Sequence, residues 1–282
     1  MRLGKTNLQL VSDGEYRMDG AGLFGVMPKA EWQELAEPDE QNRILIPLYC
    51  LLIETGKQMI LVDTGYGDKL SDQEREFMCL KGDGRLLGSL AAAGVRPEDI
   101  DIVINTHLHA DHCGGNTHYD KDGNLTPVFP HALYVVQRTE LADAMYPNER
   151  TRGTYHRENF EPLERAGRLR VLWGDSRLAD EVRVLLTPGH TPAHQSVVIE
   201  SGGETAVFLA DTAHWPLHME RLEVLTAYDA QPLVTLETKR RLARWAIECS
   251  ALLIFNHHPD GMAGYLHPTG RPDRFRLESV SI

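Results

Sequence analysis

The chain has 282 residues, of which 42% are hydrophobic and 25% charged, as in an ordinary globular protein. Its formal net charge of −12 argues against nucleic acid or an anionic membrane as the main partner, because both attract basic surfaces. Four cysteines without a CxxC pair, an N-terminus without an apolar segment and the lack of any long apolar run predict a reduced, cytoplasmic protein that does not span a membrane.

The first part of the chain predicts strands and a long irregular arm. Residues 8–18 predict two short strands joined by a tight turn at the Asp-Gly dipeptide. Residues 19–47 are rich in glycine and proline and predict an irregular arm. Residues 46–54 and 59–65 then predict a β-hairpin around the turn TGKQ.

The remainder of the chain predicts a layered α/β arrangement, in which strands alternate with helices. A helix at 85–94 ends at Gly94, and the longest helix is expected at 233–249. Residues 274–282 alternate like an edge strand. Further strands are predicted at 101–106, 132–137, 181–190, 195–201, 204–211 and 251–258, and helical segments at 138–146 and in the second half of 147–167.

Residues that bind metals follow four of these strands. A dense group of histidines and an aspartate comes directly after 101–106, and a histidine or an aspartate follows each of the strand segments 182–187, 205–210 and 251–256. Strand ends that meet at one edge of an α/β sheet would bring these loops together. Such donors suit Zn²⁺, and also Fe, Mn or Co, and one zinc takes about four ligands. The set is too large for one ion and indicates two: His107, His109, Asp111, His112, His190, Asp211 and His257.

The same motifs resemble those of the metallo-β-lactamase superfamily. THLHADHCGG contains the HxHxDH pattern, and TPGHT, FLADT and FNHHP follow it in the family's order, with LVDTG before it. The resemblance implies an αββα sandwich made by one domain over residues 1–282, with an arm or lid around 19–47. It also implies a first metal held by His107, His109 and His190, a second held by Asp111, His112 and His257, and Asp211 as the bridge. His258 is the alternative to His257.

Two residues near the motifs have both a structural and a functional interpretation. Asp63 in VDTG is expected to form a turn and to support a ligand without binding metal. His214, three residues after Asp211, is either a packed residue beside Trp215 or a pocket residue that donates to the substrate or leaving group. Asp111, Asp211 and His214 are the candidate catalytic residues.

The segment GAGLFGVMPKAEW within the arm also has two interpretations. Its apolar side chains, among them Phe24, Met27 and Trp32, either pack on the body or a second subunit or form a wall or lid over the metal site. The second option resembles the arm of lactonase-like and organophosphate-hydrolase-like family members, and a homodimer is expected on that basis. The glycines match GxGxxG, but no buried strand precedes them and Pro28 interrupts the following helix, so an exposed loop is predicted instead of a dinucleotide site.

The resemblance and the motifs together predict a hydrolase with two divalent metal ions, most simply Zn²⁺. A hydroxide shared by the two ions would attack a small-molecule lactone or carboxylic ester, with an acyl-homoserine lactone as the leading substrate. The alternative is a phosphotriesterase acting on organophosphates or an aryl-ester hydrolase, which His214 favours. A protein that binds metal without catalysis is the third interpretation.

Overall fold

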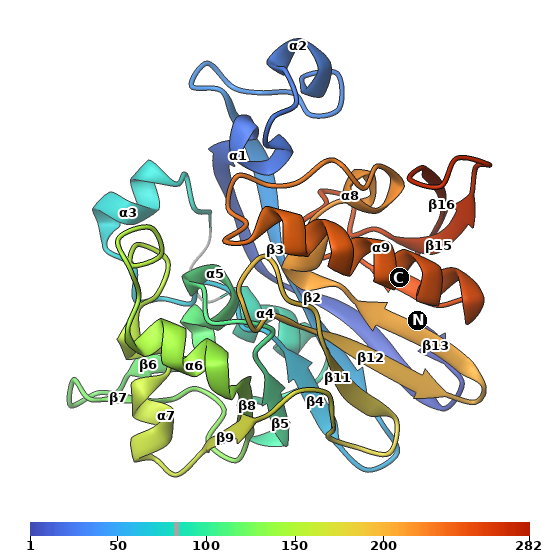
Figure 1. Cartoon of the computed structure of the whole chain (residues 1–282). Helices are drawn as coiled ribbons and strands as arrows, with labels where there is room; N and C mark the ends of the chain where they lie inside the picture. The colour runs from blue at the N-terminus through green and yellow to red at the C-terminus, as the bar shows by residue number, and fades with distance from the viewer. Residues whose placement is uncertain (82–84) are drawn as a thin grey trace.

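Two β-sheets packed face to face form the centre of the protein, and helices cover their outer faces (Figure 1). The computed structural model describes residues 1–81 and 85–282. Apolar side chains of both sheets, such as Leu51, Ile60 and Val197, meet in a fully buried layer between them. The order of layers is therefore helix, sheet, sheet, helix, which confirms the predicted αββα sandwich.

The first sheet is built from the N-terminal half of the chain. Its first four strands are antiparallel neighbours, and β4, β5, β8 and β9 are parallel. Helix α4 (Arg85–Ala92) packs Leu86 and Leu90 on the outer face of this sheet. In spatial order the strands are β1 (Arg2–Leu3), β2 (Thr6–Asp19), β3 (Arg43–Glu54), β4 (Met59–Val62), β5 (Ile102–Ile104), β8 (Leu133–Gln137) and β9 (Leu169–Leu172).

The second sheet is built from the C-terminal half. Its strands are antiparallel neighbours except for the parallel pair β13 and β14. Helix α9 (Pro232–Glu248) packs Leu242 and Ala246 on its outer face. In spatial order the strands are β10 (Ser176–Arg177), β11 (Val182–Leu186), β12 (Gln195–Ser201), β13 (Glu204–Phe208), β14 (Leu252–Ile254), β15 (Ala263–Pro268) and β16 (Phe275–Val280).

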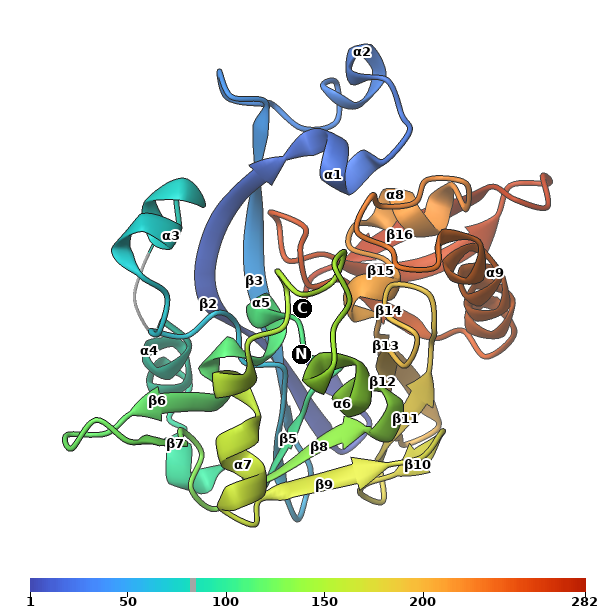
Figure 2. The same cartoon turned by 60° about the vertical axis from the view of Figure 1, so that its left-hand side comes forward.

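Short elements occupy the edges and the connections, as Figure 2 shows from a second side. Two of them, α1 and α2, lie in the arm, which extends beyond the edges of the sheets. The short elements are α1 (Gly20–Phe24), α2 (Lys29–Trp32), α3 (Asp72–Phe77), η1 (Pro97–Asp99), α5 (Ala110–Cys113), η2 (Gly114–Asn116), β6 (Thr117–Tyr119), β7 (Leu125–Pro127), α6 (Arg138–Met145), η3 (Arg157–Asn159), α7 (Glu161–Arg165), η4 (Ala210–Thr212) and α8 (Pro216–Glu220).

Most of the predicted elements are confirmed, but the predicted turn at Asp13–Gly14 is wrong. Strand β2 runs through this dipeptide beside β3 and contains only a bulge there. The buried carboxylate of Asp13 accepts hydrogen bonds from the backbone N–H groups of Gly67 and Leu86, at 2.9 and 3.1 Å. Gly14 takes a φ of 108°, which suits a bulge. The dipeptide therefore anchors two neighbouring segments instead of reversing the chain.

The glycine-rich segment of the arm is not the exposed loop that was predicted. Residues 20–24 form the short helix α1, and Leu23, Phe24 and Trp32 are completely buried. The ring of Phe24 stacks on Trp32 and meets the edge of Trp215, each with ring centres 5.5 Å apart. Aromatic packing onto the body thus orders this part of the arm.

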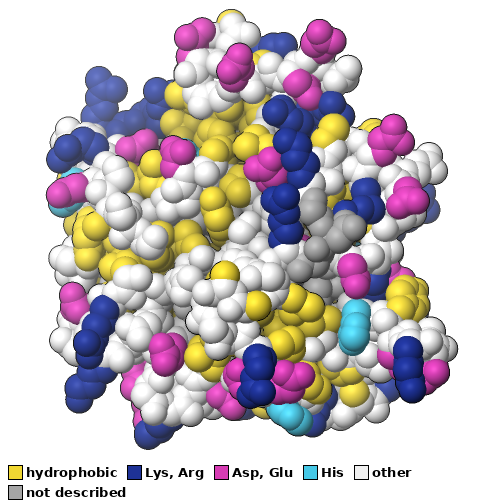
Figure 3. All heavy atoms as spheres, turned by 180° about the vertical axis from the view of Figure 1, so that it is seen from behind, with side chains coloured by type: hydrophobic (Ala, Val, Ile, Leu, Met, Phe, Trp, Pro, Cys, Tyr) yellow, Lys and Arg dark blue, Asp and Glu magenta, His cyan; other side chains and the backbone are white. Residues whose placement is uncertain are grey.

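Charged groups of both signs are spread over the surface. On the face shown in Figure 3, lysine and arginine side chains are interspersed with aspartate and glutamate around apolar areas. Within the described residues, no helix has the length and apolar character needed to cross a membrane.

Candidate metal centre

Loops at the ends of four strands bring the seven predicted metal-binding residues together. The buried strands β5, β11, β13 and β14 place these loops side by side at one edge of the sandwich. The loop after β5 carries His107 and His109 and leads into α5, which carries Asp111 and His112; His190 follows β11, Asp211 lies in η4 after β13, and His257 follows β14.

The first group of donors is His107, His109 and His190. One potential donor atom from each ring lies within 4.8 Å of those of the other two, and all three residues are buried. Nε2 of His190 is 3.1 Å from Nδ1 of His109. Three imidazoles in this arrangement leave a fourth position open in a tetrahedral zinc site.

The second group of donors is Asp111, His112 and His257. Their potential donor atoms also lie within 4.8 Å of one another. Nε2 of His257 is 3.3 Å from Nε2 of His112. His258, the alternative ligand, points elsewhere: its ring meets Trp215, with ring centres 5.0 Å apart, and it lies near Asp260.

Asp211 lies between the two groups and turns one carboxylate oxygen toward each. Oδ1 is 3.0 Å from Nε2 of His112 and 3.3 Å from Nε2 of His257. Oδ2 is 3.3 Å from Nε2 of His190. A carboxylate in this position has the geometry to bind two cations at once.

The donor set fits divalent cations. Nε2 of His107 is buried and has no hydrogen-bond partner among the described residues. Its other ring nitrogen, Nδ1, lies 3.1 Å from the hydroxyl of Thr106. Buried lone pairs without a partner are costly, and a divalent ion supplies the missing partner. The ring nitrogens of His190 and His109 face each other at 3.1 Å, and those of His257 and His112 at 3.3 Å. A cation between the nitrogens of each pair would likewise bind their lone pairs.

The electrostatics of the site divide its histidines into two kinds. Burial and the neighbouring imidazoles hold the pKa values of His107 and His109 well below that of an ordinary histidine, so both rings are neutral. Burial opposes ionisation of Asp211, but the histidines around it, His112 foremost, hold the pKa of its carboxyl well below the usual range. Burial also acts to lower the pKa values of His112 and His190, but the neighbouring carboxylates, Asp211 foremost, outweigh it and raise both, so the site combines two neutral rings with an ionised carboxylate and its two paired histidines.

Asp63 supports two of the histidines at once. Its Oδ2 accepts from Nδ1 of His112 at 2.8 Å and from the hydroxyl of Thr106 at 2.8 Å. Thr106 in turn contacts Nδ1 of His107. The carboxylate of Asp63 therefore turns Nε2 of both rings toward the site. The backbone of Asp63 has a φ of 60°, which fits the predicted turn.

Three further supports were missed by the sequence analysis. Asp229 lies 3.2 Å from Nδ1 of His190 through Oδ1. Buried Glu140 accepts from the backbone N–H of Leu108 and the hydroxyl of Thr191, which ties the loops of His109 and His190 together. Nε2 of His194 accepts a hydrogen bond from the backbone N–H of Asp211 at 3.2 Å. Asp229, Glu140 and His194 have no regular spacing from the motifs in the sequence, so their roles become visible only in the folded structure.

His214 lies at the edge of the centre. Its Nε2 is 3.0 Å from Oδ2 of Asp211, and its Nδ1 is buried without a partner among the described residues. Burial lowers the pKa of His214, so the ring is neutral and donates from Nε2 to Asp211. His214 thus lies beside Asp211 and lines the cavity described below, and its role in the chemistry stays a prediction.

A cavity of about 790 Å³ opens onto both groups. Tyr16, Tyr66 and Tyr228 line it, and the hydroxyl of Tyr16 lies 3.4 Å from Oδ2 of Asp111. Apolar side chains such as Met18 and Phe77 also face it, and so do charged ones such as Arg150. The cavity thus combines polar and apolar groups, as many small-molecule sites do.

The wall predicted from the arm is not found around this cavity. His214 is among the lining residues, but Phe24, Met27 and Trp32 are not. Phe24 and Trp32 are buried in a separate apolar cluster, and Met27 packs against it. The structural interpretation of these three residues is the correct one, because their apolar surface is spent on packing the arm.

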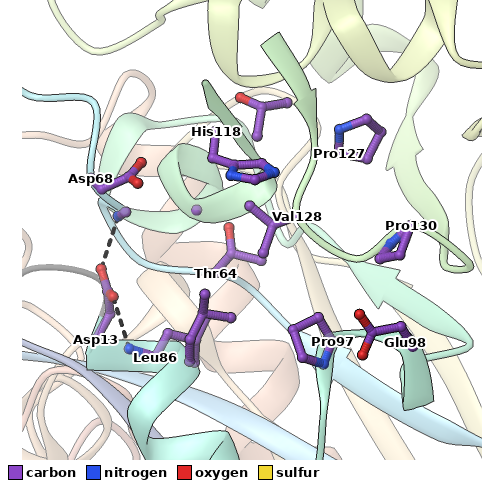
Figure 4. Close-up of a pocket in the computed structure, with 14 residues that line it drawn as sticks. Asp13, Thr64, Asp68, Leu86, Pro97, Glu98, His118, Pro127, Val128 and Pro130 are labelled. Atoms are coloured by element: carbon purple, nitrogen blue, oxygen red, sulfur yellow. Dashed lines mark hydrogen bonds between the residues drawn. The ribbon is translucent and has the colours of Figure 1, made fainter. Parts of the chain in front are cut away.

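A second cavity, of about 350 Å³, lies behind the metal-binding loop (Figure 4). Thr64 and Val128 line it, and Asp13 is anchored at its side by the two backbone hydrogen bonds drawn in the figure. Burial raises the pKa of Asp13 to about 6. None of the seven predicted ligands lines this cavity, so it is separate from the candidate centre.

Comparisons with known proteins agree with this geometry. The family model described as the metallo-beta-lactamase superfamily matches residues 45–244. An N-acyl homoserine lactonase of Bacillus cereus is 29% identical over 227 residues, which cover 77% of this chain and 83% of that protein. A solved structure of a probable metal-dependent hydrolase from Staphylococcus aureus has a TM-score of 0.89 at 27% identity and covers 100% of both chains. A solved N-acyl homoserine lactone hydrolase, with N-hexanoyl-L-homoserine bound at its catalytic metal center, has a TM-score of 0.71 at 26% identity and covers 90% of this chain and 94% of its own.

Proposed function

The chain belongs to the metallo-β-lactamase superfamily, and on that premise we propose that it hydrolyses lactones at a centre of two divalent cations, with N-acyl homoserine lactones as the leading substrates. The observation that carries the proposal is the position of Asp211, whose two oxygens face the two groups of donors. The relatives named as lactonases support the choice of substrate. Zn²⁺ is the proposed metal, and Fe, Mn or Co would suit the same donors.

The proposed ligands are those that the resemblance implies. His107, His109 and His190 would hold one cation, the second group would hold the other, and Asp211 would bind both. When bound, the cations supply Lewis acidity, which lowers the pKa of water toward neutrality and polarises an ester carbonyl. The carboxylates of Asp111 and Asp211 orient the attacking water, and Tyr16 holds Asp111 through its hydroxyl.

The reaction itself is an addition of water across the ring ester. The water oxygen forms a bond to the carbonyl carbon, the bond between that carbon and the ring oxygen breaks, and the ring oxygen takes up a proton. We assign the delivery of that proton to Nε2 of His214, which already donates to the carboxylate beside the reacting atoms, and the proton released by the attacking water returns to the ring, so that His214 ends neutral. The apolar side chains in the cavity wall, among them Met18 and Phe77, would contact the acyl chain.

A lactone panel tests this function. Metal-loaded protein is offered N-hexanoyl homoserine lactone, γ-butyrolactone, p-nitrophenyl acetate and paraoxon, with and without EDTA. We expect the acyl lactone to have the highest kcat/KM and all turnover to disappear with EDTA. Paraoxon hydrolysed orders of magnitude faster than the lactones would favour the phosphotriesterase alternative, which His214 motivates. Tight metal binding without turnover of any ester would favour a metal-binding protein.

We also propose that one domain spans residues 1–282, that the protein acts in the cytoplasm and that it forms a homodimer through its arm. The arm exposes Val26, which is 97% exposed, and Leu35. Exposed apolar side chains on a projecting segment are typical of contacts between subunits. Light scattering after gel filtration tests this: a mass near twice 31.7 kDa is expected, and a single-chain mass would contradict the dimer.

A further inference from the structure

The loop between α8 and α9 (residues 221–231, here the positioning loop) determines where His190 lies. The backbone N–H groups of Ala230 and Gln231 donate to the carbonyl oxygens of His190 and Gly189, both at 2.9 Å. Oδ1 of Asp229 faces Nδ1 of the same histidine at 3.2 Å. The loop therefore fixes both the backbone and the ring of His190, and a shift of the loop would change the orientation of this ring.

The arm is bound directly to the positioning loop. The backbone N–H of Ala227 donates to the carbonyl oxygen of Gly22 at 2.8 Å. Nε2 of His218, in α8, contacts the carbonyl oxygen of Leu23 at 3.0 Å. Figures 1 and 2 both show the chain between α8 and α9 beside α1.

Two glycines of the GAGLFG segment make this approach possible. A Cβ atom on Gly22 would lie 2.0 Å from the hydroxyl oxygen of Tyr228 and 2.5 Å from its Cζ. A Cβ atom on Gly25 would lie 2.1 Å from the carbonyl oxygen of Leu225, and Gly25 also takes a φ of 59°. Both contacts are with the positioning loop. The GxGxxG segment, which is not a dinucleotide site, therefore allows the arm to approach this loop closely.

We propose that Gly22 is a positioning residue for the metal centre: by leaving room for the ring of Tyr228, it keeps Asp229 against His190. An added methyl group at position 22 would overlap the outer end of the Tyr228 side chain, and the shift of residue 228 would pass to Asp229, the next residue along the chain. The carboxylate would move away from Nδ1, and His190 would lose the hydrogen bond that presents Nε2 to the cation. This inference rests on the proposed metal centre and extends it to residues far from the ligands.

Gly22→Ala tests the inference cleanly because alanine favours a helix more than glycine does. Gly22 lies in α1 without a positive φ, so the substitution should not disturb α1 itself. Gly88→Ala in α4 is the matched control, since a Cβ atom there meets no atom within 4 Å. Folding of each variant is checked by circular dichroism.

The measurement is the affinity for Zn²⁺ alone, by competition with a chromophoric chelator. We expect Gly22→Ala to weaken Zn²⁺ binding at one site by about tenfold. Loss of a residue that supports a metal ligand weakens binding by about 10- to 100-fold, and an indirect change should lie at the lower end of that range. Gly88→Ala should bind as the parent does. A parent that binds no Zn²⁺ tightly would refute the proposed centre, whereas a Gly22→Ala variant with the parent's affinity would refute only this inference.

Changes at Tyr228 separate the proposed contact from a general effect of Gly22. In the Gly22→Ala background, Tyr228→Phe removes the nearest atom and Tyr228→Ala removes the ring, so Zn²⁺ affinity should recover in that order. Tyr228→Ala alone should alter KM, because Tyr228 lines the cavity, and should leave Zn²⁺ affinity unchanged. If both double variants bind Zn²⁺ equally and more weakly than the parent, the inference is overturned. This comparison does not need the single Gly22→Ala variant, so it also serves if that variant does not fold.

Discussion

The clustered histidines owe their orientation to neighbours outside the ligand set. Asp63 holds His112 directly and His107 through Thr106. The carbonyl oxygen of Pro47 lies 2.8 Å from Nδ1 of His257. In each case the bonded nitrogen is Nδ1, so Nε2 remains for the centre.

Asp63→Asn should lower metal affinity without changing the ligands. The amide keeps the shape of the side chain, but it no longer offers two charged acceptors to His112 and Thr106. Loss of such a support weakens metal binding by about 10- to 100-fold. Chelator competition with Zn²⁺ measures the effect, and the exposed Asp260→Asn, beside the non-ligand His258, is the control. Equal affinities of the parent and the Asp63 variant would contradict this role.

His214→Ala should lower kcat by about 100-fold while both cations remain bound. The reason is the loss of the donor at Nε2, which lies 3.0 Å from Asp211. Steady-state kinetics with N-hexanoyl homoserine lactone and metal analysis of the same sample provide the measurement. His131→Ala, at an exposed histidine, is the control. A variant with the parent's kcat would return His214 to a packing role.

At the scale of residues, the sequence predicts those that have a recognisable spacing. The seven proposed ligands and the support by Asp63 follow from motifs within a few positions of strand ends. Asp229 and Glu140 could not be predicted, because each reaches a partner about 40 or 50 positions away in the chain only after the chain has folded. The apolar arm was misleading for a related reason: composition does not say whether Phe24 faces a cavity or the core.

Among the elements, α9 carries an unusual residue on its buried face. Nζ of Lys239 donates to the carbonyl oxygen of Val224 at 2.5 Å, and the side chain is 1% exposed. Burial, opposed by Asp229 and Glu223, lowers the pKa of Lys239 to about 7. The longest helix therefore fixes the start of the same loop that carries Asp229.

This buried lysine predicts a specific pH dependence of stability. In the unfolded chain Lys239 keeps its proton up to a pH of about 10.5, whereas in the fold it loses it near 7. The unfolded state thus binds more protons between these values, and the free energy of unfolding should rise with pH across this window. Below about pH 7 both states are charged, and the cost of burying the charge is present in full.

Lys239→Met should remove that dependence. The free energy of unfolding of the metal-loaded protein is measured with guanidinium at pH 6.5 and pH 9, and the value of the variant is subtracted from that of the parent at each pH. The parent should gain a few kcal/mol relative to the variant on going to pH 9, a magnitude that follows from the size of the pKa shift. Lys121→Met, at an exposed position, should show no such change. A parent and a Lys239 variant with parallel pH profiles would contradict the argument.

Elements with a clear apolar pattern were predicted well, and those without one were missed. The hairpin of β3 and β4 and the helix α9 have regular alternation or helical periodicity. Strands β10 and β15 have almost none, since β10 has two polar residues and β15 contains glycine, histidine and proline. Pairing with neighbouring strands makes them β-structure, and such pairing is not visible in a local window.

At the scale of the whole molecule, the sandwich explains why residues 150 positions apart share one centre. The two halves of the chain form the two sheets, and the buried layer between them aligns the ends of β5, β11, β13 and β14. Asp211 comes from one half and Asp111 from the other, and both face the same cavity. The centre thus forms only when the sheets are packed together.

Anomalous diffraction from a crystal grown with Zn²⁺ tests the central claim most directly. The account predicts two peaks, about 3.5–4 Å apart. One should be bound by His107, His109 and His190, the other by Asp111, His112 and His257, and Asp211 should contact both. A single peak, or two peaks of which neither touches Asp211, would contradict it.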